Sequence, residues 1–248
     1  MEYYKIRKKN LMLTSFSFIS IIYIIAAVLP AIVLLIYVYS QEHVDPEPTP
    51  LIIKLLIAGA VSAVIAVVLE QVGEGILKHF VPENTYLYIY IFTFLIVGVV
   101  EEGVKFIFLK IGTWANPHFN YKFDGIVYSV AVSLGFAGLE NVGYIFRYGL
   151  LIAGQRAVLA VPAHVGFAVF MGIFYSRSKM YHNRGRRITG RLNGFFAWFF
   201  PAMLHGFYDT TAMLQSTTST IVYISFVIVM YITVFTLVRN EGKRDMHL

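Results

Sequence analysis

The sequence lacks cysteine altogether. Disulfide bonds, thiolate metal ligands and cysteine nucleophiles are therefore excluded, while the redox compartment stays undetermined. Charge is also scarce, since only 14% of the 248 residues are Asp, Glu, Lys or Arg. The chain has no HExxH zinc motif, no tandem repeat and no linker long enough to separate two domains. We therefore expect one domain over residues 1–248.

Apolar residues fill most of the chain instead. Hydrophobic residues make up 58% of the sequence, and the mean hydropathy is +0.68. Too little polar surface remains to cover a water-soluble domain of this size. The apolar blocks are about 20 residues or longer, which is the length a helix needs to cross roughly 30 Å of hydrocarbon. The sequence therefore predicts an all-α, multi-pass integral membrane protein, placed in the plasma membrane.

The apolar blocks predict a bundle of about seven transmembrane helices, with six to eight as the range. The predicted spans are residues 13–39, 51–69, 85–111, 124–148, 151–175, 192–214 and 219–238. The range reflects the polar, amphipathic segment 70–84, which would change the parity if it were interfacial or re-entrant. A basic segment, 1–12, precedes the first span, and a polar tail, 239–248, follows the last.

The basic residues bear on orientation. The net charge of +6 lies mostly in two patches, residues 5–9 and 177–191. Counting Lys and Arg on alternate sides of the seven spans favours an N-terminus outside the cell, with the basic loop 176–191 in the cytoplasm. The first patch argues for the opposite orientation. Both patches are typical of topology signals, so we give nucleic-acid binding little weight.

Seven of the ionisable side chains inside the predicted spans carry most of the functional information. A charged group near the bilayer centre costs about 2.5 to 3.5 kcal/mol on insertion scales, so each needs a partner, a cavity or a purpose. The seven are Glu101, Glu102, Lys105, Glu140, His164, His205 and Asp209.

The stretch VVEEGVK places two adjacent glutamates beside one lysine. Glu101 and Lys105 have i,i+4 spacing and can form an ion pair on one helix face. Glu102 is rotated by about 100 degrees and is expected to point to a different neighbour. One carboxylate is then left in need of another cation, a proton or a metal, as in a catalytic site. A structural ion pair that locks helix packing is the alternative.

The stretch SVAVSLGFAGLENVGYIF adds further polar groups. Glu140, Asn141 and Tyr144 together can hold a water or a carbonyl group. The small residues before them, Ser133 to Gly138, are expected to let another helix approach closely. Interhelical hydrogen bonding, which an asparagine supplies alone, is the simpler explanation of this polar group.

Two histidines lie well inside predicted spans. Pro162 is expected to free backbone carbonyls near His164. His205 and Asp209 have i,i+4 spacing, so the carboxylate can accept from one ring nitrogen and direct the other nitrogen inward, as it does for metal ligands and general bases. The alternatives are an interhelical hydrogen bond for His164 and a self-neutralising polar pair for His205 and Asp209.

Together these residues match the requirements of water activation for hydrolysis. A carboxylate can take the proton of an attacking water, while histidine, asparagine or a metal ion stabilises the oxyanion. We therefore predict a catalytic set supported by Lys105, Tyr144 and Asp209. The predicted catalytic residues are Glu101, Glu102, Glu140, Asn141, His164 and His205.

These motifs, in this order, resemble the PrsW family of intramembrane proteases, which is related to the CAAX-processing type II (CPBP/Abi) membrane proteases. The resemblance spans roughly residues 30–210. It is carried by DPEP (Asp45–Pro48), EEGVK (Glu101–Lys105), GFAGLENVGY (Gly135–Tyr144), His164 and HGFYD (His205–Asp209).

The resemblance implies an intramembrane endopeptidase that cleaves a single-pass, membrane-anchored protein, such as an anti-sigma factor, at a site near the membrane surface. The family is described as metalloproteases, so Zn²⁺ is a possible cofactor, but a metal-free glutamate mechanism is equally open. A tentative zinc set, His164, His205 and Glu101, requires that all three converge. Two alternative functions are a proton-coupled transporter that uses the same groups as a relay, and a non-catalytic membrane scaffold. The oligomeric state is undetermined.

Overall fold

The computed structural model describes the backbone of residues 2–248 and the side chains of residues 18–248. The side chains of the predicted basic segment 1–12 lie outside the described residues. The described chain is helical apart from turns and one isolated β-bridge. Its elements are α1 (Glu2–Tyr39), α2 (Thr49–Phe80), α3 (Tyr86–Ile91), the π-helix η1 (Phe92–Gly98), α4 (Val99–Thr113), α5 (Asp124–Tyr148), α6 (Leu151–Val158), α7 (Ala160–Asn183), α8 (Arg187–Met213) and α9 (Thr217–Lys243).

The prediction of an all-α membrane protein is confirmed. Among the described residues, five helices are long and apolar enough to cross a membrane. They are Phe18–Tyr39, Thr49–Phe80, Asp124–Tyr148, Leu151–Asn183 (α6 with α7) and Thr217–Lys243. The other two predicted spans fall on the divided α3–η1–α4 segment and on α8. The count of seven crossings therefore stays a prediction.

Two boundary predictions need correction. The segment 70–84 does not form a separate interfacial or re-entrant piece, because α2 continues to Phe80. An i,i+4 ion pair of 2.9 Å between Glu74 and Lys78 supports these last turns. The predicted tail 239–248 is helical up to Lys243, since α9 also runs past its apolar residues.

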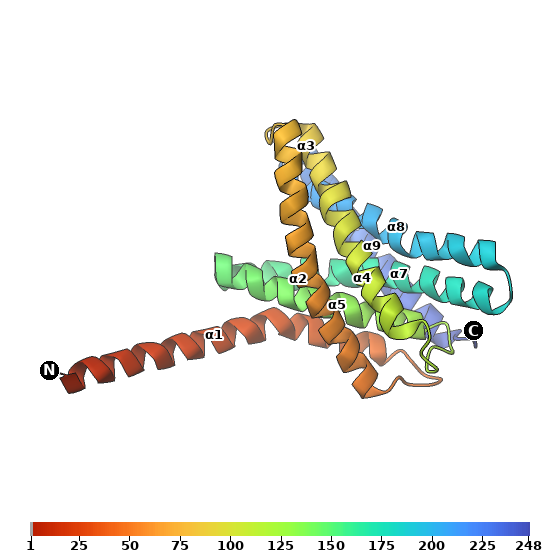
Figure 1. Cartoon of the computed structure of the whole chain (residues 1–248), viewed down its shortest axis with the longest axis horizontal. Coiled ribbons are helices and arrows are strands. Elements are labelled where there is room, and N and C mark those ends of the chain that lie inside the picture. Colours follow the sequence, from red (N-terminus) through yellow and green to blue (C-terminus); the bar gives the residue numbers. More distant parts are fainter. Residues whose placement is uncertain (1) are drawn as a thin grey trace.

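Helix α5 is the centre of the bundle. It packs against α1, α2 and α7, and α8 covers the other side of α7. The first half of α5 is almost entirely buried. Figure 1 shows α2 and the α3–η1–α4 segment side by side, running steeply across the direction of α5 and α7. The polar residues near the end of α5 thus lie beside several helices at once.

Glycines allow α2 and α5 to cross at backbone contact. A Cβ on Gly135 would lie 2.0 Å from the carbonyl oxygen of Leu56, and a Cβ on Gly59 would lie 1.9 Å from that of Val132. The expectation of close approach at Gly135 is thus confirmed. Gly138 has no such neighbour within 4 Å, so the prediction of a close helix approach is wrong at Gly138.

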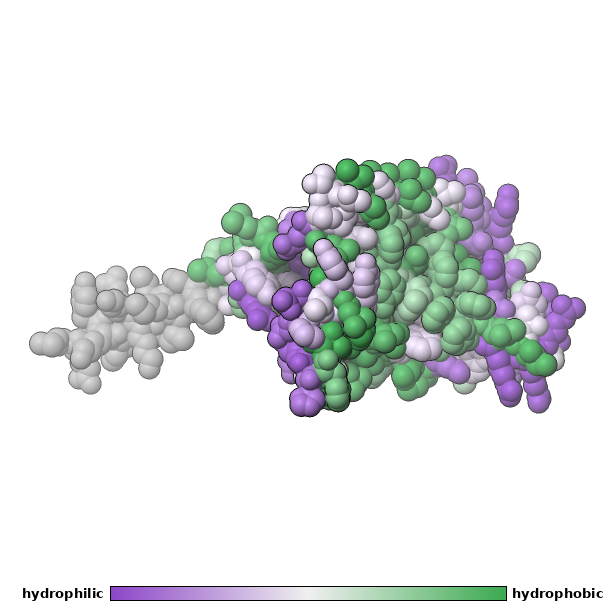
Figure 2. Space-filling model, turned by 90° about the horizontal axis from the view of Figure 1, so that it is seen from above, coloured by the Kyte–Doolittle hydropathy of each residue, from purple (hydrophilic) through white to green (hydrophobic). Residues whose placement is uncertain are grey.

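The polar ends of the bundle are separated by an apolar surface. Figure 2 shows hydrophobic residues across the middle of the visible face and hydrophilic residues gathered at the end away from the grey segment. The C-terminal tail lies against the loop 114–123. The Leu248 amide donates to the Asn120 carbonyl at 2.7 Å, and the Lys122 amide donates to the Met246 carbonyl at 3.0 Å.

The π-helix η1 lies directly before the two adjacent glutamates. Its wider turn is closed by the Val99 amide, which donates to the carbonyl of Phe94 five residues earlier. Here Gly98 and Gly206 bring η1 against α8, since a Cβ on either would lie 2.5 Å from the other segment. Short π-helical stretches are frequent at functional sites. The first turn of α4 is thereby fixed against α8.

The α2–α5 crossing gives a test of the fold. We expect Gly135→Ala to lower the free energy of unfolding by about 1 to 3 kcal/mol, because the added methyl group meets a backbone carbonyl that cannot move aside. Gly138→Ala is the matched control, three residues further along the same helix, and should not destabilise. Thermal unfolding in detergent micelles measures both. Equal stability of the two variants would contradict the crossing.

Candidate functional site

The ammonium group of Lys105 lies at the centre of the predicted site and is fully buried. It donates to Glu101 Oε2 at 3.0 Å and to Glu102 Oε1 at 2.8 Å. It also lies 3.1 Å from His164 Nδ1 and 3.9 Å from the ring centre of Phe136. The predicted pair of Glu101 and Lys105 is confirmed. The prediction for Glu102 holds only in part, because its i,i+3 spacing lets it share the same ammonium.

His164 joins this cluster to a second ion pair. An ammonium can only donate, so Nδ1 of His164 accepts from Lys105 and Nε2 carries the ring proton. That Nε2 lies 3.0 Å from Glu140 Oε2 and donates to it. The same carboxylate oxygen accepts from Arg156 Nη2 at 2.8 Å. Glu140 on α5 is thus held between a histidine of α7 and an arginine of α6.

Pro162 sets the position of His164. A proline has no amide proton, so the carbonyl of Val158, four residues earlier, loses its helical donor. The Tyr231 hydroxyl of α9 donates to that carbonyl and, at 3.2 Å, to the carbonyl of Leu159. The expectation of a freed carbonyl is confirmed. The helix is interrupted at this point, between the end of α6 and the start of α7. His164 lies in the first turns of α7.

His205 on α8 completes the cluster. Its Nδ1 lies 3.0 Å from Glu102 Oε1 and 3.9 Å from Glu101 Oε2, and its Nε2 lies 3.4 Å from Asp209 Oδ2. The ring stacks on Phe167, with 4.8 Å between the ring centres. The predicted pair of His205 and Asp209 is confirmed, and the nitrogen that it directs inward faces the paired glutamates.

Most of the predicted residues line one cavity of about 260 Å³. Glu102 and Lys105 do not line it and lie behind Glu101, fully buried. The cavity therefore distinguishes the two adjacent glutamates, which the sequence does not. The polar residues that line it are Glu70, Glu101, Glu140, Tyr144, Arg156, His164, His205, Tyr208 and Asp209.

Asn141 has a different position from the one predicted. It is buried but does not line the cavity. Its side-chain oxygen accepts from Arg156 Nε, and its nitrogen donates to the carbonyl of Ala27 on α1 at 3.2 Å. Both of its polar groups are thus engaged, and it links α1 to the arginine of the site.

Sequence reasoning missed two lining residues, Arg156 and Glu70. Arg156 lies within the predicted span 151–175, so the cost of a charge in an apolar run should have marked it as well. Its guanidinium also covers the ring of Tyr144 at 3.8 Å. Glu70 falls in the predicted polar segment 70–84, after the predicted span 51–69, and the continuation of α2 through this segment brings it to the cavity. One of its oxygens is buried without a hydrogen bond.

The residues do not fit a zinc ion in this arrangement. The tentative set His164, His205 and Glu101 lines one cavity, but it is not a set whose ligand atoms all converge. The set that does converge among the described residues is Glu101, Glu102 and His164, with ligand atoms within 4.8 Å of one another. Its donor types suit zinc, but the Lys105 ammonium contacts all three. The cation that these three groups share is therefore a lysine.

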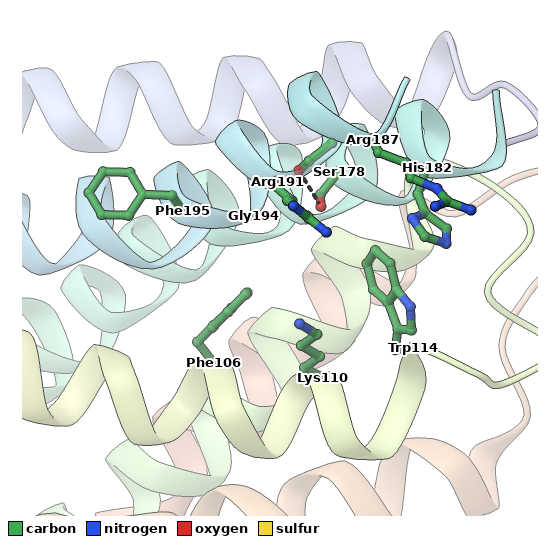
Figure 3. Close-up of a pocket in the computed structure, with 10 residues that line it drawn as sticks. Phe106, Lys110, Trp114, Ser178, His182, Arg187, Arg191, Gly194 and Phe195 are labelled. Carbon is green, nitrogen blue, oxygen red and sulfur yellow. Dashed lines mark hydrogen bonds between the residues drawn. The ribbon is translucent and has the colours of Figure 1, made fainter. Parts of the chain in front are cut away.

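A larger cavity, of about 520 Å³, lies elsewhere, between the ends of α4, α7 and α8 (Figure 3). Figure 3 shows Lys110 of α4 and Arg191 of α8 directed into the space between those helices. His182 and Arg187 add to its basic lining, and no carboxylate lines it. It is built largely from the basic loop 176–191 and contains none of the predicted site residues. We therefore place the candidate active site in the smaller cavity.

Comparison with known proteins shows the family of the chain. Residues 47–237 match the model of the PrsW family of intramembrane metalloproteases, a range that contains every residue of the cavity. The chain is 35% identical to Protease PrsW of Clostridioides difficile over 209 residues, which are 83% of this chain and 85% of that protein.

Two further relatives are also named Protease PrsW. That of Bacillus subtilis is 32% identical over 74% of this chain and 79% of its own length. That of Halalkalibacterium halodurans is 27% identical over 89% of this chain and 97% of its own length. No solved structure matches the chain. The prediction of a peptidase, rather than a transporter, is thus confirmed. The chain is a peptide hydrolase and a multi-pass integral membrane protein. It belongs to the PrsW family of intramembrane metalloproteases.

Proposed function

We propose that Glu101 is the general base that activates the attacking water. One observation carries this assignment: Glu101 lines the cavity together with both histidines, whereas its neighbour Glu102 does not. In the proposed step the Glu101 carboxylate takes a proton from a water as the oxygen attacks the carbonyl carbon of the scissile peptide. Glu101 then returns the proton to the departing amine nitrogen, which leaves a carboxylate and an amine as products.

Arg156, which lines the cavity, is the proposed donor to the oxyanion of the tetrahedral intermediate. Both ring nitrogens of His205 face carboxylates, so His205 is proposed to position Glu102 and Asp209 beside the cavity. Arg156 uses one N–H on Glu140 and another on Asn141, so further N–H groups of its guanidinium are free to donate. Donors held in place before the reaction stabilise developing charge without reorganising. This differs from the sequence-based expectation, in which the asparagine was a direct donor.

Glu102, Lys105 and Asn141 are proposed to position the reacting groups. Lys105 fixes the carboxylate of Glu101 from behind, and Glu102 holds both that lysine and His205. Charged hydrogen bonds in a dry environment are strong and directional. Since the zinc donors are occupied by Lys105, no step of this mechanism passes through a metal.

We propose that the substrate approaches along an apolar groove between α2, η1 and α5. The groove has a volume of about 600 Å³ and shares Glu101, Glu140 and Tyr144 with the cavity. Its walls include Val64 and Val68 of α2, which are more than half exposed. An apolar wall that ends at carboxylates suits a transmembrane segment with a polar scissile bond.

We also propose a substrate class, a cellular location and a number of membrane crossings. A single-pass protein such as an anti-sigma factor is the substrate class that the resemblance implies, and the plasma membrane is the proposed location. Seven crossings are supported by α3–η1–α4 and α8, which lie beside the apolar helices and together have the length of two further spans. Kinship with the CAAX-processing group is also a prediction.

The two glutamates give the first test. We expect Glu101→Gln to lower kcat by about 100-fold to 10,000-fold, the usual contribution of a general base, and to lower the melting temperature less than Glu102→Gln does. Glu102→Gln should lower both kcat and the melting temperature, because it removes a partner of two buried groups. Purified variants and a single-pass substrate measure the rates. Full activity of Glu101→Gln would disprove the assignment.

Metal dependence gives the second test. We expect 1,10-phenanthroline, which removes transition metals, to leave the cleavage rate unchanged, because Lys105 contacts all three members of the converging donor set beside the catalytic cavity. The control compound is the isomer 1,7-phenanthroline, which does not chelate metals. Inhibition by the 1,10 isomer alone, reversed by added Zn²⁺, would contradict this expectation.

The groove gives the third test. Val68→Trp should lower kcat/KM for a membrane-anchored substrate by about 10-fold or more, because a bulky side chain displaces the substrate from the reacting groups. Val72→Trp is the matched control, since Val72 lies one turn further along α2 with similar exposure and does not line the groove. Equal kinetics for both variants would exclude this route.

A further inference from the structure

Three carboxylates meet at the other end of α5, away from the catalytic cavity. Glu42 and Glu47 lie in the loop between α1 and α2, and Asp124 is the first residue of α5. One oxygen of each lies within 4.8 Å of the others. The exposed fraction of the residue surface is 6% for Glu42, 3% for Glu47 and 0% for Asp124. Asp124 precedes Glu140 by 16 positions, or roughly 24 Å of helix, so this cluster is separate from the proposed catalytic groups.

Each of the three carboxylates has one oxygen without a hydrogen-bond partner. Glu42 Oε1, Glu47 Oε2 and Asp124 Oδ1 are buried without a hydrogen bond. No Lys or Arg among residues 18–248 forms an ion pair with any of the three. Three buried carboxylates this close together, without a cation beside them, need a shared counter-charge.

A fourth group points to a ligand independently of the acids. Tyr128, one turn into α5, is fully buried, and its hydroxyl has no partner in good hydrogen-bond geometry. That hydroxyl is directed at the cluster, with the carboxylate of Glu47 as its nearest polar neighbour and those of Asp124 and Glu42 close by. A buried phenol among three carboxylates would normally donate to one of them. An additional partner placed between these oxygens accounts for all four unsatisfied atoms.

We propose that Glu42, Glu47 and Asp124 bind a hard divalent cation, with the Tyr128 hydroxyl as a further neutral oxygen donor. The donor set contains only oxygen, which is the preference of Ca²⁺ and Mg²⁺ and not of zinc. Remaining coordination positions would be filled by water or backbone carbonyls. The site carries three potential negative charges, so a dication leaves it close to neutral.

The position of this cation site gives it a structural role. The 40–48 loop, the start of α5 and the C-terminal tail meet there. Asp245 of the tail accepts from the Phe123 amide at 2.9 Å. A Cβ on Gly242 of α9 would lie 2.3 Å from the carbonyl oxygen of Gln41. A bound cation would therefore join three segments that are far apart in the sequence.

The test uses the full chain, purified in detergent and dialysed against EDTA. CaCl₂ and MgCl₂ are then titrated, with binding followed by calorimetry and unfolding by circular dichroism. We expect one equivalent of at least one cation to bind. At about 100 times Kd, the melting temperature should rise by about 5 to 10 °C. Both readouts are independent of proteolytic activity.

Glu42→Gln and Glu47→Gln should each weaken cation binding by at least about 10-fold. Asp45→Asn is the matched control, because Asp45 lies in the same loop but is exposed and outside the cluster; it should keep the full response. Absence of binding by the wild-type chain would overturn the proposal and leave the cluster neutralised by protons. Undiminished binding by both Gln variants would also overturn it. If a variant does not fold, the wild-type titration and its metal content by mass spectrometry decide alone.

Discussion

The buried ammonium of Lys105 is the interaction on which the active site depends. It contacts two glutamates of its own helix and a histidine of α7 at 2.8 to 3.1 Å. The ammonium is fully buried, so removal of one partner would leave an unpaired buried charge at a cost of about 3 to 5 kcal/mol. The lysine therefore fixes how α4 and α7 face each other. It also orients His164, because a group that only donates leaves the histidine one tautomer.

The remaining helices follow from this arrangement. His164 donates to Glu140, whose second partner, Arg156, is in turn held by Asn141. Each link crosses to a different helix, so the network draws α4, α5, α6 and α7 together, while Glu102 adds α8 through His205. Such a network needs backbones at close range. Glycines provide that range at the crossing of α2 with α5 and at the contact of η1 with α8.

Sequence reasoning predicted the ionisable residues of the site well and their roles less well. Depth in a span is a property of local hydropathy, so Glu101, Glu140, His164 and His205 could all be found. Which of two adjacent glutamates faces a cavity depends on the rotation of α4, which η1 sets and periodicity does not reveal. The function of Asn141 depends on a contact with α1, more than 100 residues away. Likewise, the predicted ends of α5 are correct, because turn residues flank this helix. The predicted end of α2 is too early, because the helix continues through polar residues, where a prediction from hydropathy ends the span.

The π-helix before the paired glutamates makes chain length itself part of the candidate site. Its wide turn accommodates one residue more than an α-helical turn would. If residues 92–98 formed a regular α-helix with no residue lost, everything after them would be rotated by about 100 degrees. Glu101 would then face away from its histidines although every proposed catalytic side chain was still encoded. Alignments of this stretch should therefore be judged by their gaps as much as by their identities.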